Sequence, residues 1–266
     1  TVLKVKGIED MPREIFGPVL HIAAFKASEI DKVIATINAT GYGLTFGLHS
    51  RIDDRVQHIV DGLHVGNTYV NRNQIGAVVG SQPFGGEGLS GTGPKAGGPH
   101  YLTRFTRAPA PEASPDDAAT PAAEVARALA APVPVAEARA ENMPGPTGES
   151  NRLTMTPRAP LLCLGPGRAA ALAQAEAVRK LGGHAVEAPG LSPGALETLQ
   201  GFSGALWWGD AEAGRAFAQA LSARKGPILP LIAMPDAGHT HLERHLCIDT
   251  TASGGNAQLL AEVGNV

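Results

Sequence analysis

The chain has 266 residues, enough for about two domains of ordinary size. Its 22 Lys and Arg residues are balanced by 25 Asp and Glu residues, which gives a formal charge of −3. This charge excludes a broad positive field for a nucleic-acid backbone or an anionic membrane surface. The longest apolar stretch, 227–234, contains Pro230 and is much shorter than the roughly 20 residues of a membrane span. We therefore expect a soluble cytoplasmic protein with no nucleic-acid or membrane partner.

The first 106 residues alternate between strand-like and helix-like segments. Strands are expected at 1–5, 18–25, 44–49 and 65–70, and helices at 28–38 and 53–60. In the first helix, Ser28 is the expected N-cap, and the apolar residues that follow it recur at helical spacing. The segment 81–98 is too rich in glycine for a helix or a paired strand, so we expect a loop there.

The composition changes after residue 106. Residues 107–150 are rich in Ala, Pro and Glu, which is typical of a linker. Ser114 to Asp117 is a candidate helix start there, and Glu124 to Ala130 is expected to be the only stable turn or two. Within the next segment, 151–240, strands are expected at 160–164, 185–187, 204–208 and 227–233, and helices at 168–181 and 213–223. This spacing predicts a βαβ unit with a right-handed crossover, and hence a second small α/β domain.

Three motifs in the first 71 residues carry a resemblance to a known family. They are Arg-Glu-Ile-Phe-Gly-Pro-Val at 13–19, Asn-Ala-Thr-Gly-Tyr-Gly-Leu-Thr-Phe-Gly at 38–47 and Gly-Asn-Thr-Tyr-Val-Asn at 66–71. In this order and at these distances they resemble the C-terminal third of the aldehyde dehydrogenase catalytic domain. Further motifs at 82–86, 90–92 and 95–102 are similar to the branch that oxidises L-glutamate γ-semialdehyde with NAD. The resemblance covers residues 1–106 and implies an α/β fold.

The resemblance implies that Glu14 and Phe16 contact the cofactor NAD. Glu14 matches the glutamate that accepts hydrogen bonds from the nicotinamide ribose hydroxyls, a role that suits a carboxylate because it is acceptor-only. Phe16 matches the aromatic wall beside the nicotinamide ribose. Without the surrounding match, a solvated carboxylate and a core phenylalanine are the commoner roles of these residue types.

The resemblance also implies a substrate site in the glycine-rich segment. Gly97 and Gly98 match the aldehyde anchor, where backbone N–H groups grip the substrate's α-carboxylate with no side chain in the way. Phe105 matches the aromatic residue that packs on the aliphatic stem of the substrate, and Ser90 is a candidate polar contact. A simple turn at the two glycines and a core role for Phe105 are the alternatives.

The residues that carry the chemistry of aldehyde oxidation are missing. That reaction needs a cysteine thiolate as nucleophile, and the family places it before the motif that holds Glu14. Cys163 lies on an expected buried strand and Cys247 precedes an Ile-Asp-Thr run, so neither has the expected surroundings. Their spacing also gives no disulfide framework or zinc site. Because the chain opens with Thr1 rather than Met, we expect a part of a longer protein that is inactive by itself.

The second half is similar to the C-terminal region of long proline utilization A proteins. In that family, residues 151–240 correspond to a degenerate aldehyde-dehydrogenase-like α/β domain after the linker 107–150, and 241–266 to a conserved tail that returns to the dehydrogenase. The resemblance implies a bifunctional protein whose FAD-dependent proline dehydrogenase half lies outside this chain. Its expected partners are the small-molecule substrate and the remainder of the same polypeptide, and a homo-oligomer is compatible with it. The second domain and the tail would cover a substrate passage.

Two alternatives accompany this interpretation. Gly165-Pro166-Gly167 with Ala170 meets a loose dinucleotide fingerprint, and Glu187 follows at a suitable distance. Pro166 removes one N–H that would face a pyrophosphate, so we expect a structural role for this turn and no second cofactor. The other alternative is a non-catalytic assembly module derived from an aldehyde dehydrogenase.

Overall fold

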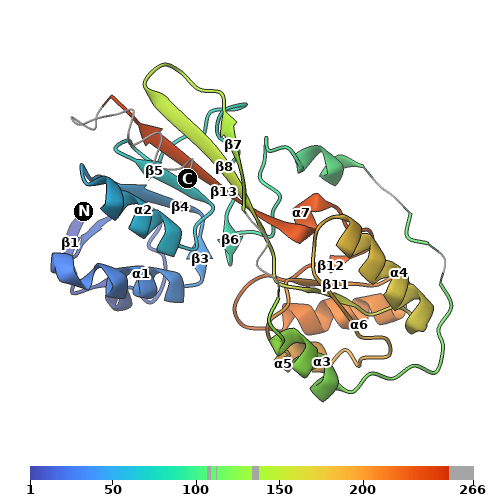
Figure 1. The fold of residues 1–266 in the computed structure, drawn as a ribbon. Coiled ribbons are helices and arrows are strands. Elements are labelled where there is room, and N and C mark those ends of the chain that lie inside the picture. The colour runs from blue at the N-terminus through green and yellow to red at the C-terminus, as the bar shows by residue number, and fades with distance from the viewer. Residues whose placement is uncertain (107–108, 112, 134–137, 252–266) are drawn as a thin grey trace.

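The structure is a computed structural model that describes residues 1–106, 109–111, 113–133 and 138–251. Figure 1 shows two lobes, one built from the N-terminal segment and one from the middle of the chain, joined by long strands. The α/β class expected from the sequence is confirmed. Within the described residues, no helix has the length and apolar character that crossing a membrane requires.

The first lobe begins with short elements. Its strands outside the main sheet form two pairs, β1 (Val2–Lys4) with β2 (Leu20–Ile22) in parallel, and β3 (Tyr42–Gly43) with β6 (Glu87–Gly88) antiparallel. Its helical segments are η1 (Ile8–Asp10), η2 (Ala27–Glu29), α1 (Ile30–Ala39), α2 (Asp53–Gly62) and η3 (Tyr101–Phe105). The expected cap at Ser28 is wrong, because Ser28 lies inside η2 and Glu29 is the N-cap of α1.

The main sheet of the first lobe takes strands from both ends of the described chain. Its order is β4-β5-β13-β8-β7. The bounds in that order are Thr45–Leu48, Asn67–Val70, His241–Asp249, Glu149–Pro157 and Arg139–Met143. β4, β5 and β13 are parallel, whereas β8 is antiparallel to β13 and β7. β13 thus joins the dehydrogenase-like segment to a hairpin from the linker region.

A small apolar core fixes α2 on this sheet. Val56 of α2, Val70 of β5, and Leu246 and Ile248 of β13 form one buried cluster. Each such side chain contributes about 1.5–3 kcal/mol by leaving water. β13 therefore contributes to the core of the first lobe as well as to its hydrogen bonding.

The second lobe has a parallel sheet of order β10-β9-β11-β12. The strands are Ala185–Glu187, Leu161–Cys163, Gly204–Leu206 and Leu231–Ile232 in that order. The helices are α3 (Ala122–Ala130), α4 (Gly167–Lys180), α5 (Ala195–Thr198) and α6 (Ala211–Ser222), and α7 (Ala237–Thr240) leads into β13. The predicted βαβ unit is confirmed, since α4 connects β9 to its parallel neighbour β10.

The linker region holds more structure than its composition indicates. α3 includes the expected turn, but the expectation that it is the only stable element in 107–150 is wrong, because β7 and the start of β8 lie there too. β7 is almost entirely exposed, so no apolar alternation marks it. The helix expected from Ser114 is also absent: Asp116 instead accepts a hydrogen bond from the Ala118 N–H in a local turn.

Candidate cofactor and substrate site

Glu14 lies at an open pocket of the first lobe with a volume of about 770 Å³. The other polar or aromatic residues that line it are Glu9, Arg13, His21, Thr36, Thr40, Tyr42, Thr45 and Ser90. Within the described part of the chain, the Glu14 carboxylate makes no hydrogen bond or ion pair, so both oxygens remain acceptors for a ligand. Phe16, which is 94% exposed, does not line this pocket.

These two residues fit the nicotinamide ribose end of NAD. An unpaired carboxylate at an open pocket suits hydroxyl donors, and a phenylalanine with almost its whole surface in water is not a core residue. Within this chain Phe16 therefore lies outside the apolar core. Its contact with a cofactor stays a prediction.

Ser90 lies at the same pocket as Glu14 but already has a structural contact. Its Oγ accepts a 3.0 Å hydrogen bond from the Gly43 N–H, and its own N–H donates to the Glu87 carbonyl at 3.0 Å. The side chain thus holds the glycine-rich segment against β3. A substrate contact would be a second role for this hydroxyl.

Gly97 and Gly98 form a tight turn outside the Glu14 pocket. The Gly98 N–H donates a 3.0 Å hydrogen bond to the Lys95 carbonyl, so that donor is already used inside the turn. Gly97 has φ +72°, and a Cβ there would meet open space. No acceptor within the described residues takes the Gly97 N–H. Of the two predicted donors, Gly97 is the one available to a carboxylate.

Phe105 ends η3, shortly after this turn. It is 72% exposed, so within this chain it does not pack into an apolar core. Its ring meets Tyr101 edge-on, with 5.2 Å between the ring centroids. The structure therefore presents Gly97 and Phe105 near the surface on one segment, but it does not place them in the pocket that Glu14 and Ser90 share.

A buried lysine ties the glycine-rich segment to β5. Lys95 is 2% exposed, and its Nζ donates to Asn67 Oδ1 at 2.7 Å and to the Gly85 carbonyl. Asn67 itself accepts the Gly85 N–H at 3.1 Å and donates to the Pro83 carbonyl at 2.9 Å. Burial lowers the pKa of the Lys95 ammonium to about 7, although the nearby Glu243 and Glu87 charges oppose this shift.

Glu243 of β13 holds the same segment from the other side. Its Oε2 accepts a 2.6 Å hydrogen bond from the Lys95 N–H, and its Oε1 lies 2.8 Å from His100 Nδ1. The next residue, Arg244, makes two contacts of 3.1 and 2.7 Å with the Glu87 carboxylate. Lys95 lies in a motif that the sequence singled out, but nothing in one sequence pairs it with Glu243.

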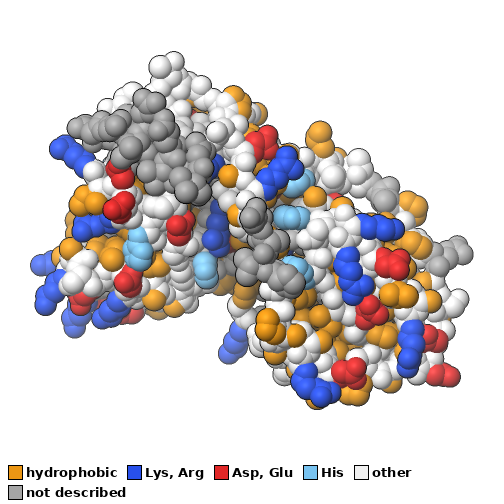
Figure 2. Space-filling model, viewed as in Figure 1, with side chains coloured by type: hydrophobic (Ala, Val, Ile, Leu, Met, Phe, Trp, Pro, Cys, Tyr) orange, Lys and Arg blue, Asp and Glu red, His pale blue; other side chains and the backbone are white. Residues whose placement is uncertain are grey.

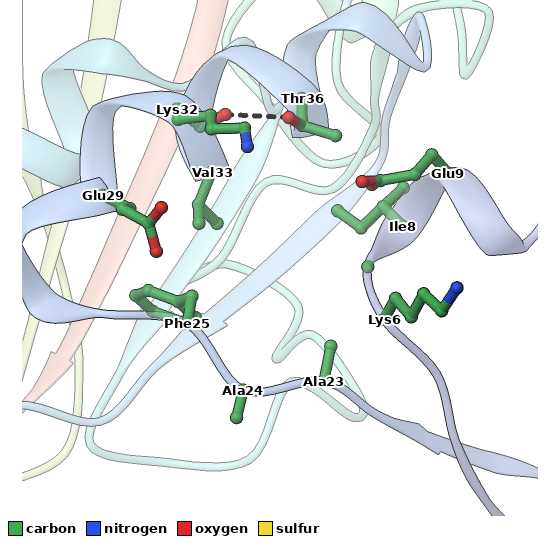
Figure 3. A pocket seen from close by; sticks show the side chains of 11 residues that line it. Lys6, Ile8, Glu9, Ala23, Ala24, Phe25, Glu29, Lys32, Val33 and Thr36 are labelled. Atoms are coloured by element: carbon green, nitrogen blue, oxygen red, sulfur yellow. Dashed lines mark hydrogen bonds between the residues drawn. The ribbon is translucent and has the colours of Figure 1, made fainter.

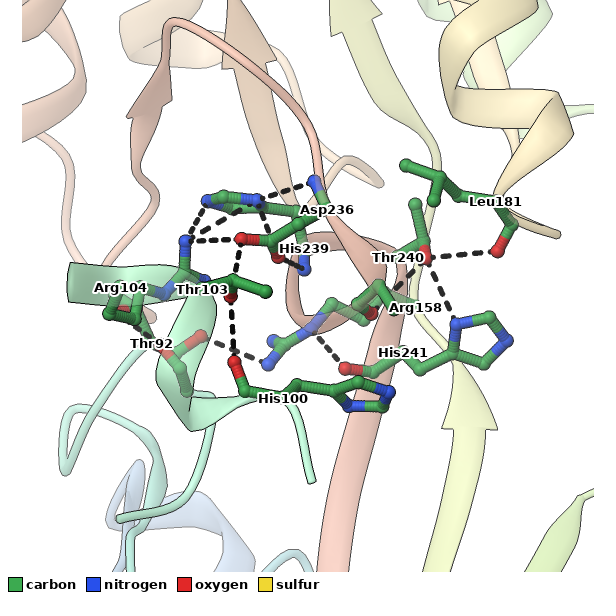
Figure 4. Close-up of polar contacts among 12 residues, drawn as sticks. Thr92, His100, Thr103, Arg104, Arg158, Leu181, Asp236, His239, Thr240 and His241 are labelled. Carbon is green, nitrogen blue, oxygen red and sulfur yellow. Dashed lines mark hydrogen bonds and ion pairs between the residues drawn. The ribbon is translucent and has the colours of Figure 1, made fainter. Parts of the chain in front are cut away.

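Residues near the second lobe contact the glycine-rich segment and the helical turn η3 that follows it (Figure 4). Asp236, at the start of α7, accepts hydrogen bonds from Thr103 Oγ1 at 3.0 Å and from Arg104 at 3.2 Å. Arg158, which follows β8, donates to the Thr92 carbonyl at 2.9 Å and to the His241 carbonyl at 3.0 Å. In Figure 2, histidine side chains gather along the junction of the two lobes.

Neighbouring residues stabilise the ionised form of the Asp236 carboxyl group. Burial alone would raise the pKa of this carboxyl, but the hydrogen bond and charge of His239 and the charge of Arg104 outweigh burial and hold the pKa at about 2. Asp236 is therefore ionised throughout the physiological range. The contact between the two lobes therefore includes the ionised Asp236 carboxylate in addition to packing.

The cysteines do not lie at the candidate site. Cys163 lies in β9 and Cys247 in β13, and both are fully buried. Burial raises the pKa of the Cys163 thiol to about 12 and that of Cys247 to about 11. Neither thiol is therefore ionised near neutral pH, and neither has the thiolate character of a nucleophile.

The dinucleotide-like turn before α4 is occupied by the chain itself. The Asp116 carboxylate accepts a 2.8 Å hydrogen bond from the Arg168 N–H in the first turn of α4. A Cβ added at Gly167 would lie 2.9 Å from Asp116 Cγ, so the two residues are in direct contact. A bound phosphate would need this same helix N-terminus. This contact supports the structural interpretation of the fingerprint.

A smaller pocket lies beside α1 (Figure 3). Its volume is about 170 Å³, and Phe25 and Val33 form part of its apolar wall. None of the predicted cofactor or substrate residues lines it. It adjoins the pocket at Glu14, because Ile8, Glu9 and Thr36 line both.

Comparison with known proteins identifies the family of the N-terminal part of the first lobe. A model described as the aldehyde dehydrogenase family matches residues 6–110. These residues are an aldehyde dehydrogenase segment. They include Glu14, Ser90, the Gly97 turn and Phe105, so the resemblance drawn from the motifs is confirmed.

The full chain is similar to larger proteins. The bifunctional protein PutA of Salmonella typhimurium is 36% identical over 98% of this chain and 24% of that protein. The 1-pyrroline-5-carboxylate dehydrogenase of Bacillus cereus (strain AH187) is 48% identical over 37% of this chain and 19% of that protein. The structure of Proline Utilization A from Corynebacterium freiburgense matches 88% of this chain and 25% of its own, with a TM-score of 0.53 and 24% identity. The chain spans about a quarter of the length of the PutA proteins it matches, and the solved structure supports the fold.

Proposed function

We propose that this chain is the C-terminal part of a bifunctional proline catabolic enzyme of the cytoplasm. In that enzyme it contributes to the NAD-dependent oxidation of L-glutamate γ-semialdehyde to L-glutamate, and an FAD-dependent half outside the chain oxidises proline. The similarity to PutA over 98% of the chain supports the bifunctional assignment. The observation that carries the site is the unpaired Glu14 carboxylate at an open pocket of an aldehyde dehydrogenase segment.

The cofactor half of this proposal uses Glu14 and Phe16. NAD, when bound, supplies the hydride acceptor for aldehyde oxidation. Glu14 accepts hydrogen bonds from ribose hydroxyls and so fixes the orientation of that end of the cofactor. The exposed Phe16 ring packs against the nicotinamide ribose end of the cofactor. This contact excludes water from one side of the site.

The substrate half uses the turn and the aromatic residue that follows it. The Gly97 N–H binds the α-carboxylate, and Phe105 packs on the aliphatic stem. Holding the α-carboxylate and the stem in place fixes the position of the aldehyde carbon relative to the nucleophile. The thiolate that attacks this carbon comes from outside the described chain, because Cys163 and Cys247 are buried and protonated.

The remaining parts of the chain have a covering role in this proposal. The proposed degenerate domain, 151–240, also takes α3 from the linker 107–150, because Val125 and Leu129 lie in its core. The start of that range belongs elsewhere, since the whole of β8, like β7, lies in the sheet of the first lobe. The tail returns to the dehydrogenase through β13. The rest of the proposed tail, 252–266, lies outside the described residues. This arrangement suits a cover over a passage between the two catalytic sites.

The test of the cofactor assignment is a substitution in the full-length protein that contains this chain. Glu14→Ala removes the acceptor for two hydroxyls, so the KM for NAD should rise about tenfold or more in NADH formation from the semialdehyde. Glu176→Ala, an exposed carboxylate on α4, is the matched control and should leave the KM unchanged. Unchanged KM and kcat in Glu14→Ala would contradict the cofactor role. Failure of the full-length protein to form NADH would favour the assembly module.

A further inference from the structure

Glu243 is a buried carboxylate, and both of its oxygens contact residues that flank the Gly97 turn. Its side chain is 2% exposed, and its two partners are the Lys95 N–H and His100 Nδ1. A buried carboxylate is costly unless it is hydrogen-bonded and compensated by positive charge. The Lys95 ammonium and the Arg158 guanidinium supply positive charge that interacts with Glu243, and the His100 ring supplies a polar contact.

The contact with Lys95 is a contact with the anchor turn itself. The Lys95 N–H goes to Glu243, and the Lys95 carbonyl accepts the Gly98 N–H at 3.0 Å. A Cβ added at Gly98 would lie 3.1 Å from the Lys95 oxygen and 3.5 Å from Glu243 Oε2. The carboxylate therefore packs directly against the buried side of the turn.

Gly97 lies on the other side of this turn. It is exposed, and open space surrounds the position of its missing Cβ. A ligand carboxylate thus meets Gly97 without touching Glu243. Glu243 acts on the ligand only through the shape of the turn between Lys95 and Gly98.

We propose that Glu243 is a positioning residue that sets the anchor turn, and through it the preference for aldehydes that carry an α-carboxylate. The proposal rests on the proposed function. It assigns to the tail strand β13 a part in substrate selection, in addition to its place in the sheet. Loss of Glu243 leaves the buried Lys95 N–H unpaired, so the turn relaxes and the Gly97 N–H loses its fixed direction.

The experiment compares two aldehydes in the full-length protein. L-glutamate γ-semialdehyde has the α-carboxylate, and butanal offers a similar aliphatic stem without it. Glu243→Ala should raise the KM for the semialdehyde about tenfold, while the KM for butanal and both kcat values stay within about twofold. Glu243→Gln keeps an acceptor oxygen for the Lys95 N–H, so it should restore most of the affinity for the semialdehyde.

The control is Glu187→Gln, which removes a carboxylate paired with Arg179 at the surface of the second lobe and should change neither KM. If Glu243→Ala does not fold, Glu243→Met removes the acceptor of the Lys95 N–H without a large cavity and should raise only the semialdehyde KM, by about tenfold. Equal losses with both aldehydes, or no change with either, would overturn the positioning role. A wild-type protein that oxidises butanal but not the semialdehyde would instead overturn the proposed function.

Discussion

The Glu243 carboxylate accepts a 2.6 Å hydrogen bond from the backbone N–H of Lys95, 148 positions earlier in the chain. This contact joins the last described strand to the turn that we propose binds substrate. With Lys95 Nζ bound to Asn67 on β5, the turn is held from two strands of one sheet. The glycine-rich segment is therefore ordered by buried polar contacts rather than by an apolar core.

Gly97→Ala tests whether the turn itself binds the α-carboxylate. At φ +72° a Cβ is strained although nothing lies within 4 Å of it, so the substitution should cost about 1 kcal/mol of folding stability. Gly226→Ala is a matched control, with φ +97° and the same open surroundings in the second lobe. Both variants should unfold at a similarly lower urea concentration, but only Gly97→Ala should raise the KM for the semialdehyde. Equal KM values would contradict the anchor.

The lowered pKa of Lys95 predicts that the free energy of unfolding depends on pH. Its pKa is about 7 in the folded protein and 10.5 in the reference state, so the unfolded chain binds more protons between these values. The free energy of unfolding should therefore rise with pH, by about 1.5 kcal/mol from pH 7 to 8.5. Lys95→Met should remove this slope in urea titrations. A slope of the same size in the variant would assign it to another group.

Burial of His245 predicts that folding stability also depends on pH below pH 7. His245 is buried in β13, and neither ring nitrogen makes a hydrogen bond of good geometry within the described residues, although the Ser81 backbone lies close enough to favour the charged ring slightly. Burial first, and then the Lys95 charge, lower the pKa of the imidazole to about 4. Because the unfolded chain takes up the proton near pH 6.5, stability should fall by about 2 kcal/mol between pH 7 and 5. In His245→Gln this part of the loss should disappear from the unfolding curves, and an unchanged loss would refute the assignment.

The sequence was informative where elements carry a regular apolar pattern. α2 begins where the pattern predicted it, because its buried residues Val56 and Ile59 recur at helix spacing. β7 and β13 were missed for a physical reason. β7 has no buried face, and β13 buries Glu243 and His245, so neither strand shows the alternation that identifies strands from sequence.

The candidate site was only partly predictable. The motif around Glu14 identified a family, and exposure of Phe16 and Phe105 agrees with ligand contacts more than with core positions. The engagement of the Gly98 N–H and the pairing of Lys95 with Glu243 depend on contacts within and between distant segments. One sequence contains no record of such contacts, so they emerged only from the fold.

The most direct test of the central claim is NADH formation by the full-length protein that contains this chain, followed with NAD and L-glutamate γ-semialdehyde. We expect saturable NADH production that needs both compounds. We also expect that the semialdehyde has a lower KM than butanal, because only the semialdehyde can use the anchor turn at Gly97. No NADH formation from the semialdehyde, in protein shown to be folded, would contradict the account.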